Sequence, residues 1–580
     1  MDIERSIEYY DSHVKDLKLE DITSDEYETE IFRKLRDDDP DLTKISLNAP
    51  NYGIEDDDFG ICDDDDLGWL GYFIGRSSQL NDLTIFIDNS IEGDPGLSLP
   101  QMDALAQGIS LNRSISWLTI VGDLGDLFLQ RLGHFFRGNK NLLHLRLSEF
   151  DIGLETARNL AVDLRDMSLK SFDVERLCYD SDSGNFIDDG TVTEEVITAL
   201  STHKKLHRVE LLTCNLNRSS CMALGRLSSL KKLGLFGSSM NNVDAGGIKA
   251  LTEDMLRCLE SLEISCLNID YDKAVALSSG LLGLHSLRYL SLRKSIGDDA
   301  LQYLVAAIER KATLEWLDVS HNTSITVKGL SSFSILLQSE RCSLKYLDLS
   351  DMHIGDDGAA ALAEVLARNK SLKRLEFSEP LSMFRRVFPE SGITATGWSA
   401  FARLLCDTSS INNTYLSNHT LEMCTNNYRW NTIGNRPLPV IAPPDVECYL
   451  ALNRDMDHKH ASMYKILLNH PDFDMKPLFQ WQLKFLPLMV AWFKTARSRR
   501  HKMRLDAFTS TDSLRLREIS AIFQFMRGLP LLAVSGYLDQ KMIGAQSKKR
   551  KQTNVDSYFN QVERPLQRRN VAQETNEQAE

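Results

Sequence analysis

Leucines recur along most of this chain in the order L-x-x-L-x-L, and each group is followed by a polar turn and a second set of apolar residues. In one unit Leu344, Leu347 and Leu349 carry the first pattern. Alternation of this kind indicates a short strand whose alternate side chains point inward. Leu362 and Val365 follow at helical spacing and begin an apolar stripe. Each unit is therefore expected to contain one strand and one helix.

The first position of this strand pattern occurs thirteen times, mostly at intervals of 24 to 30 residues. The residues at this position are Leu42, Leu80, Ile115, Leu142, Leu169, Leu206, Leu230, Leu259, Leu287, Leu314, Leu344, Leu372 and Ile411. Internal repeats of this length indicate a solenoid, in which each unit packs only on its neighbours. The longer intervals contain loop insertions, including 178–190 and 379–392.

These units resemble the leucine-rich repeats of the ribonuclease-inhibitor-like class. The resemblance is carried by the leucines, the "IGDDG" turn at 354–358, the "LAEVL" helix and the "N-x-S-L" exit. Cys214 and Asn322 fall at the family's Cys/Asn position, whereas Met352 departs from it. The resemblance implies an α/β horseshoe of about 13 units over residues 42–425. Parallel strands would line its concave face, and helices would lie outside.

The segments that flank the repeats have different patterns. Residues 1–41 are acidic and predict an N-terminal cap. A Pro-rich stretch at 435–445 and helical patterns after it predict a linker and a small all-α domain at 426–540. Part of that domain, 473–493, resembles leucine-rich-repeat proteins of diatoms and related algae, which implies architecture only. Residues 541–580 lack an apolar pattern and are predicted to be disordered.

The alternate strand residues that do not point into the core should form ladders on the concave face. Three aromatic residues stand at successive third positions, and carboxylates stand at the fifth positions beside them. Exposed aromatics of this kind are typical of a binding surface, and the alternative is rings that simply cover strand edges. We predict that a protein partner binds at Tyr289, Trp316, Asp318, Tyr346, Asp348, Arg374 and Glu376. The carboxylates favour a basic or hydrogen-bond-donating partner surface. Upstream, His144, Arg208 and Lys232 occupy the third position, and no aromatic patch is expected there.

The charge of the chain is concentrated at one end. Residues 1–70 hold 23 acidic and 7 basic residues, so 7 − 23 = −16, which equals the net charge of the whole chain. Solvated loops explain this acidity most simply, and a basic partner is the alternative. There is no apolar run of about 18 residues, so no membrane span is expected. A charged N-terminus and ten cysteines without a C-x-x-C pair predict a protein that is nuclear and/or cytoplasmic, not secreted. We expect it to be a monomer.

Several common signatures of enzymes are missing from the sequence. There is no Gly-Lys dipeptide and hence no Walker A loop, and no H-E-x-x-H, G-x-S-x-G or paired-cysteine zinc pattern. Asp457 and His460 lie at a helix entrance, where a helix cap is favoured over a metal site. We therefore predict no catalytic, cofactor or metal residues, and a non-enzymatic interaction scaffold or adaptor. A GTPase-activating leucine-rich-repeat protein is an alternative, although that family's catalytic motif matches no residue here.

The C-terminal tail carries one specific motif. Gln552, Val555, Tyr558 and Phe559 resemble the sliding-clamp (PCNA)-binding box of DNA replication and repair proteins. One helical turn would gather the three apolar side chains into a plug, with Gln552 beside it to form a hydrogen bond. The preceding run of Lys548, Lys549, Arg550 and Lys551 fits a nuclear-import patch. The alternative is a cytosolic recognition or adaptor protein with an accidental tail match. Direct binding of nucleic acid is not expected.

Overall fold

The structure is a computed structural model of the chain. It describes residues 7–470 apart from 24, 50–57, 61–63, 88–98, 123–124, 150–151, 178, 181–184, 187–189, 238, 253–257, 267, 378–392 and 425–441. The chain divides into two compact units, Met1–Ile466 and Leu467–Glu580. The described residues lie almost entirely in the first unit.

One parallel sheet runs through the first unit and follows the order of the chain from β3 onward, while β1 lies between β2 and β3 at the N-terminal end. Its 14 described strands are ordered β18-β17-β16-β15-β14-β13-β11-β9-β6-β5-β4-β3-β1-β2, and the pairings between them are parallel. The strands of this sheet are β1 (Lys44–Ala49), β2 (Asp58–Gly60), β3 (Asp82–Ile87), β4 (Trp117–Val121), β5 (His144–Ser148), β6 (Ser171–Glu175), β9 (Arg208–Leu212), β11 (Lys232–Phe236), β13 (Ser261–Ser265), β14 (Tyr289–Arg293), β15 (Trp316–Asp318), β16 (Tyr346–Asp348), β17 (Arg374–Glu376) and β18 (Met423–Cys424). Two short pairs lie outside it, β10 (Asn215–Asn217) with β12 (Ser239–Asn242) and β7 (Tyr179–Asp180) with β8 (Asn185–Phe186).

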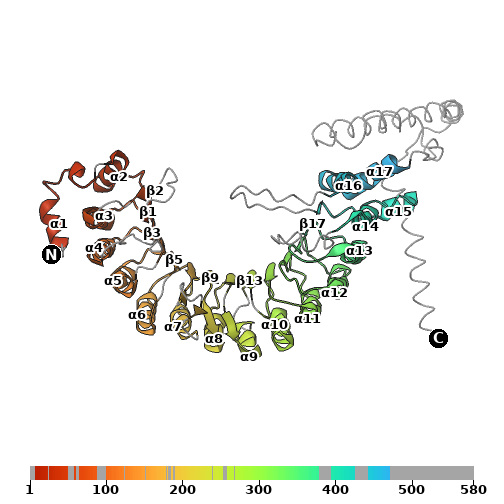
Figure 1. The fold of residues 1–580 in the computed structure, drawn as a ribbon, viewed down its shortest axis with the longest axis horizontal. Helices are drawn as coiled ribbons and strands as arrows, with labels where there is room; N and C mark the ends of the chain where they lie inside the picture. The colour runs from red at the N-terminus through yellow and green to blue at the C-terminus, as the bar shows by residue number, and fades with distance from the viewer. Residues whose placement is uncertain are drawn as a thin grey trace, which may run out of the picture. The chain divides into compact units, whose positions relative to one another are not determined.

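Most of the helices lie on the opposite side of the repeats from the concave face, and the first and last helices lie at the two ends of the array (Figure 1). They are α1 (Ile7–His13), α2 (Glu26–Arg36), α3 (Asp64–Arg76), α4 (Leu99–Ile109), α5 (Gly125–Gly138), α6 (Leu154–Leu164), α7 (Thr191–Leu200), α8 (Arg218–Gly225), α9 (Ala245–Thr252), α10 (Tyr271–Gly283), α11 (Asp298–Glu309), α12 (Val327–Leu337), α13 (Gly355–Leu366), α14 (Ala395–Leu405), α15 (Ile411–Leu416), α16 (Pro444–Asp455) and α17 (His458–Asn469). A 3₁₀ turn, η1 (Leu19–Asp21), lies between α1 and α2. The predicted α/β solenoid, with strands inside the curve and helices outside, is confirmed.

The core lies between the sheet and the helices and is built from the repeated leucines. Leu317, Leu347 and Leu375 stand side by side on adjacent strands, and all three are fully buried. Burying a side chain of this size stabilises the fold by about 1.5–3 kcal/mol. Because each repeat contributes such residues to a continuous row, the core extends along the whole solenoid.

A left-handed backbone turn ends most of these strands, and it recurs seven residues after the first-position residue. The residues with positive φ at this point are Gly122, Glu149, Arg176, Thr213, Gly237, Cys266, Lys294, His321 and Asp351. The conformation costs a non-glycine residue about 1–2 kcal/mol. In return, the backbone N–H of this residue reaches the neighbouring repeat: Lys294 N–H donates to the Ser320 carbonyl at 3.1 Å, and His321 N–H to that of Ser350 at 2.8 Å. The repeated strain is thus offset by a repeated hydrogen bond between units.

The last repeat differs from the prediction at Ile411. This residue begins α15, whose N-cap is Ser410, and Leu421 takes the first strand position instead. Met423 then pairs with Arg374. Asn418 explains the change, because its side chain accepts the Leu421 N–H at 2.9 Å and so makes the turn into the strand. Strand β2, which pairs with β1 at the N-terminal end of the sheet, was not predicted.

The predicted boundary at 426 also differs from the structure. Helix α16 and most of α17 belong to the first unit, and Asn453 of α16 donates to the Leu421 carbonyl at 2.7 Å. The physical reason is that the last repeat would otherwise expose its apolar edge. Asp457 caps α17 by accepting the His460 N–H at 3.0 Å, which confirms the predicted helix cap. The remainder of the predicted helical domain and the tail, including its clamp-binding box and basic run, lie outside the described residues.

Candidate protein-binding face

The three aromatic residues predicted on the concave face form one stack, which we call the aromatic ladder (Tyr289, Trp316 and Tyr346). Strand pairing places them directly beside one another on β14, β15 and β16. The ring centroids of Tyr289 and Trp316 are 5.6 Å apart, and those of Trp316 and Tyr346 are 3.5 Å apart with an interplanar angle of 19°. The Arg374 guanidinium continues the row, 5.7 Å from the Tyr346 ring centroid. The close spacing of paired strands brings these flat groups into contact.

Tyr346 is not the exposed aromatic that the sequence predicts. Only 7% of this residue is exposed, and its hydroxyl donates a hydrogen bond to Glu376. Its neighbours in the row cover its ring, whereas Tyr289 and Trp316 remain half-buried. Burial, followed by the bond to Glu376, raises the pKa of Tyr346. Tyr346 therefore supports the ladder, and Trp316 and Tyr289 are the members that a partner could touch.

The second ladder consists of carboxylates, Asp318, Asp348 and Glu376, which we call the acidic ladder; strand pairing sets them side by side. Its two outer members have partners that offset their charge. Asp318 accepts the hydroxyl of Ser291 at 3.0 Å, and the Arg293 Nε lies 3.8 Å from it. Glu376 accepts the Tyr346 hydroxyl and has the Arg374 Nε at 3.8 Å.

Asp348, the middle carboxylate, has no such cation. It accepts the Ser350 N–H at 2.9 Å, but it forms no ion pair within the described part of the chain. Burial, followed by the charge of Asp318 on the adjacent strand, raises the pKa of Asp348 to about 6. Asp348 is thus half-buried and close to a like charge, and no described residue supplies it with a counter-ion.

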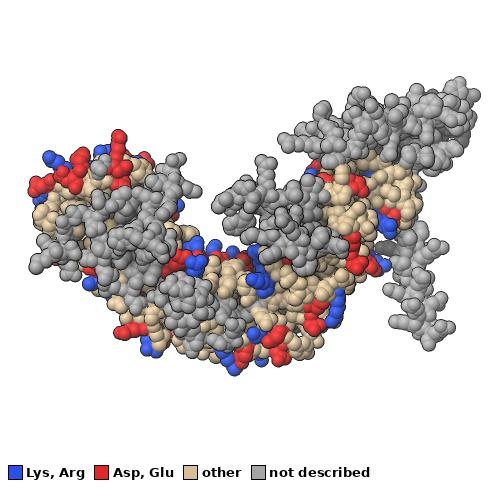
Figure 2. All heavy atoms as spheres, viewed as in Figure 1, with Lys and Arg blue, Asp and Glu red and all other residues tan. Residues whose placement is uncertain are grey.

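The upstream half of the face has the opposite arrangement, because its carboxylates are neutralised within the protein. Arg208 lies 3.3 Å from Asp173 and 2.7 Å from Glu210. Lys232 bridges Glu210 at 3.1 Å and Glu263 at 3.0 Å. Acidic and basic side chains accordingly alternate along the inner edge of the repeats (Figure 2). A charged ligand gains less from this closed network than from the acidic ladder.

The upstream units, where no aromatic patch is expected, do carry exposed aromatic residues. Trp117 occupies the third position of the unit that begins at Ile115; it is 44% exposed and stacks on His144 with ring centroids 4.4 Å apart. Phe86 on the preceding strand is 39% exposed. The rule that identified Trp316 also identifies Trp117, because both lie two residues after a first position.

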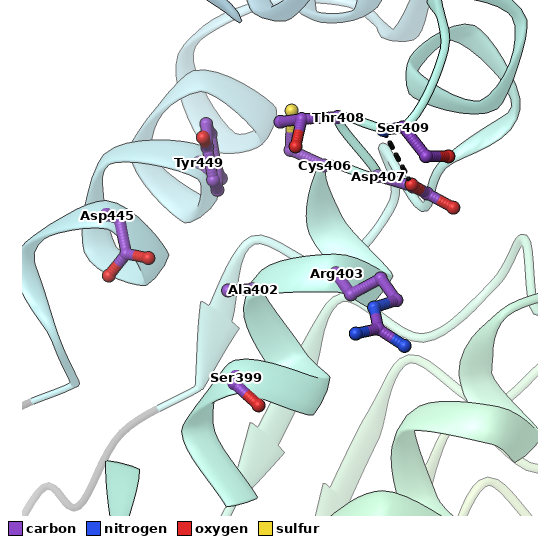
Figure 3. A pocket seen from close by; sticks show the side chains of 9 residues that line it. All are labelled: Ser399, Ala402, Arg403, Cys406, Asp407, Thr408, Ser409, Asp445 and Tyr449. Atoms are coloured by element: carbon purple, nitrogen blue, oxygen red, sulfur yellow. Dashed lines mark hydrogen bonds between the residues drawn. The ribbon is translucent and has the colours of Figure 1, made fainter. Parts of the chain in front are cut away.

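The structure also contains a pocket of about 580 Å³ near the C-terminal end of the repeats. Helix α16 contributes Asp445 and Tyr449 on one side, and α14 and the loop after it form the other (Figure 3). The Cys406 thiol in this lining is buried, which raises its pKa and keeps it protonated. Asp407 is engaged by the Ser409 N–H at 3.0 Å. The described residues contain no group of three potential metal ligands.

A fully buried lysine, Lys465 of α17, joins the last helices to the repeats. Its ammonium lies 2.7 Å from the Leu405 carbonyl, 3.3 Å from the Asn418 carbonyl, 3.1 Å from His419 Nδ1 and 2.7 Å from Asn453 Oδ1. Burial lowers the pKa of Lys465 to about 7. The pKa of His419 falls to about 4 through burial and the charge of Lys465, so this imidazole is neutral and accepts the bond. A lysine in a helix is usually solvated, and no sequence signal identified this site.

The chain is similar in sequence to proteins that contain leucine-rich repeats. A model described as "Leucine Rich repeat" matches residues 310–334 and 341–363. Human "NACHT, LRR and PYD domains-containing protein 13" is 25% identical over 370 residues, which cover 58% of this chain and 32% of that protein. Pig "Ribonuclease inhibitor" is 26% identical over 277 residues, 46% of this chain and 58% of the inhibitor. The chain thus spans less than two thirds of either relative.

Solved structures give a more distant likeness. An internalin from Listeria monocytogenes has a TM-score of 0.32 and 13% identity, and covers 65% of this chain and 96% of its own. TLR13 in its complex with ssRNA13 has a TM-score of 0.28 and 15% identity, and covers 61% of this chain and 46% of its own. No helix of the described residues is long and apolar enough to cross a membrane. The repeat pattern, the parallel sheet and the matching repeat model together identify the chain as one that contains leucine-rich repeats and folds as an α/β leucine-rich-repeat solenoid.

Proposed function

We propose that this protein is a non-enzymatic scaffold or adaptor that binds a protein partner on the concave face of β14–β17. Leucine-rich repeats generally act in protein–protein interaction, which supports this class of function. The observation that carries the proposal is that half-buried Trp316 lies beside the acidic ladder, whose middle member has no cationic partner among the described residues. Tryptophan contributes more than most residues to interfaces, and an uncompensated carboxylate favours a basic or hydrogen-bond-donating partner.

The test is Trp316→Ala in an affinity capture from cells, quantified by mass spectrometry. We expect the principal partner to be retained at least about tenfold less, because removal of a central aromatic commonly costs 2 kcal/mol or more. Trp117→Ala serves as the matched control on the same face and should retain that partner. Equal recovery with both variants and the wild-type protein would count against the proposal. Circular dichroism of each variant checks that the fold is intact.

We further propose that the tail docks on the DNA sliding clamp and that the protein is nuclear for part of its life. This rests on the match of Gln552, Val555, Tyr558 and Phe559 to the clamp-binding box, next to the basic run at 548–551. A segment that orders only on binding loses entropy, so the affinity should be on the order of micromolar.

A synthetic peptide of residues 545–565 should therefore release or absorb heat when titrated into the clamp. Tyr558→Ala combined with Phe559→Ala should remove this signal, and added salt should weaken it because the basic run acts at long range. An absence of heat at about 100 μM clamp would show that the match is accidental.

In living cells, deletion of 541–580 should move a fluorescent fusion out of the nucleus.

A further inference from the structure

The middle of the acidic ladder is an unfavourable arrangement for a protein without a ligand. Paired strands lie about 4.8 Å apart, so Asp318 and Asp348 are held close together with the same charge. Like charges directly opposite one another in a sheet are destabilising. Of these two carboxylates, Arg293 approaches only Asp318. No described residue neutralises the charge of Asp348. A charge of this kind is expected where an external cation completes the site.

A second polar group beside these carboxylates also lacks a partner. Ser320 follows Asp318 by two residues and thus faces the same side, and its backbone N–H donates to Asp318 at 2.9 Å. The residue is 2% exposed, and its hydroxyl oxygen forms no hydrogen bond with the described residues. Buried hydroxyls are usually paired, so this one indicates a place where a further donor or acceptor belongs.

The aromatic ladder limits how a ligand group can reach this floor. Trp316 lies between Tyr289 and Tyr346, so both faces of its ring are covered and only its edge is available. A long, flexible side chain could lie along that edge with its methylene groups and place a charged end on the carboxylates. Lysine and arginine have this form, an apolar stem that ends in a cation.

We propose that Asp348, with Asp318 beside it, forms a receptor for one cationic side chain, arginine or lysine, of the bound partner. This inference rests on the proposed function, since it assigns part of the same face to one group of the partner. The ammonium or guanidinium donates hydrogen bonds to the Asp348 carboxylate and neutralises the pair. Glu376, the third carboxylate of the ladder, is already engaged by the Tyr346 hydroxyl and Arg374. The described residues contain no group of three potential metal ligands, and the remaining two carboxylates suit an organic cation with several N–H donors better than a metal ion.

The probe for this receptor is a phage-displayed library of random 12-residue peptides, selected on the full-length protein at pH 7.5. We expect selected peptides to share one arginine or lysine, and replacement of that residue by norleucine should weaken binding at least about tenfold. Asp348→Asn, which keeps the shape of the side chain, should weaken the same peptides by a similar factor. Asp173→Asn is the matched control, because Asp173 lies on the same face but is paired with Arg208 at 3.3 Å. It should leave binding unchanged.

The pH dependence of peptide binding provides a second measurement. Asp348 takes up a proton as the pH falls through about 6, so wild-type binding should weaken between pH 7.5 and 5. The Asp348→Asn variant should lose most of this dependence. Peptides that require Trp316 but bind Asp348→Asn as tightly as wild type would overturn the receptor and leave the proposed face intact. A selection that yields no peptide sensitive to Trp316→Ala would overturn both.

Discussion

Lys465→Met should release the last helices of the solenoid from the repeats. The methionine side chain has nearly the length of lysine but donates no hydrogen bond, so the Leu405 carbonyl and Asn453 Oδ1 lose their donor inside the protein. Each buried acceptor left without a partner costs about 1–3 kcal/mol, so we expect a loss of about 2–4 kcal/mol. Because repeats unfold locally, the loss should appear at the C-terminal end. Amide exchange in α15 and α16 should become roughly 30-fold to 1000-fold faster by mass spectrometry.

The matched control is Lys311→Met in the middle of the solenoid. Lys311 is also buried, but its ammonium contacts one described acceptor, the Leu282 carbonyl, at 2.6 Å. Its replacement should therefore cost less, about 1 kcal/mol, and should affect the neighbouring repeats alone. If both variants accelerate exchange equally, or if α15 and α16 remain protected in Lys465→Met, the buried lysine does not hold the cap.

The leucine phase predicted most strands because the chemistry of one repeat is repeated in the next. The first-position residues from Leu80 to Leu372 are buried for the same reason, as Leu314 and Leu344 show. The phase failed at Ile411, where an insertion separates the last strand from the repeat before it. There the turn stabilised by Asn418, and not the usual repeat length, places Leu421 in the sheet. Periodicity therefore predicts the regular units and loses accuracy where one unit departs in length.

The sequence predicted which positions lie on the binding face, but not how far each side chain there is exposed. Alternation correctly placed Trp316 and Tyr346 side by side, yet it does not show that each ring covers the other. The same limit applies to the charges: Asp173 and Asp348 look alike in sequence, and only the structure shows that Arg208 pairs with the first. The role of Lys465 could not be predicted from the sequence, because its hydrogen-bond acceptors come from segments up to 60 residues away.

Asn322 is an extensively hydrogen-bonded polar side chain in the repeats, and it is 2% exposed. Its Oδ1 accepts the N–H groups of Ser295 at 2.7 Å and Ile296 at 2.8 Å. Its Nδ2 donates to the carbonyls of Leu292 at 2.8 Å and Val319 at 2.6 Å. One amide thus satisfies buried backbone groups of two successive repeats at the point where both leave the sheet. Removing it leaves several of these groups without a partner in a place that water does not reach.

We therefore expect Asn322→Ala to cost about 3–5 kcal/mol, the sum of two or more orphaned backbone groups. Since nearest-neighbour contacts hold a solenoid together, the loss should also divide its unfolding into two transitions, one on each side of β15. Chemical denaturation followed by circular dichroism measures both effects.

Cys214→Ala is the control at the equivalent position. The thiol there makes only weak contacts, 3.3 Å from the Leu212 carbonyl and 3.9 Å from that of Val174. It should cost about 1 kcal/mol and keep a single transition. Similar losses in the two variants would mean that filling this position, and not the amide bonds, stabilises the junction between repeats.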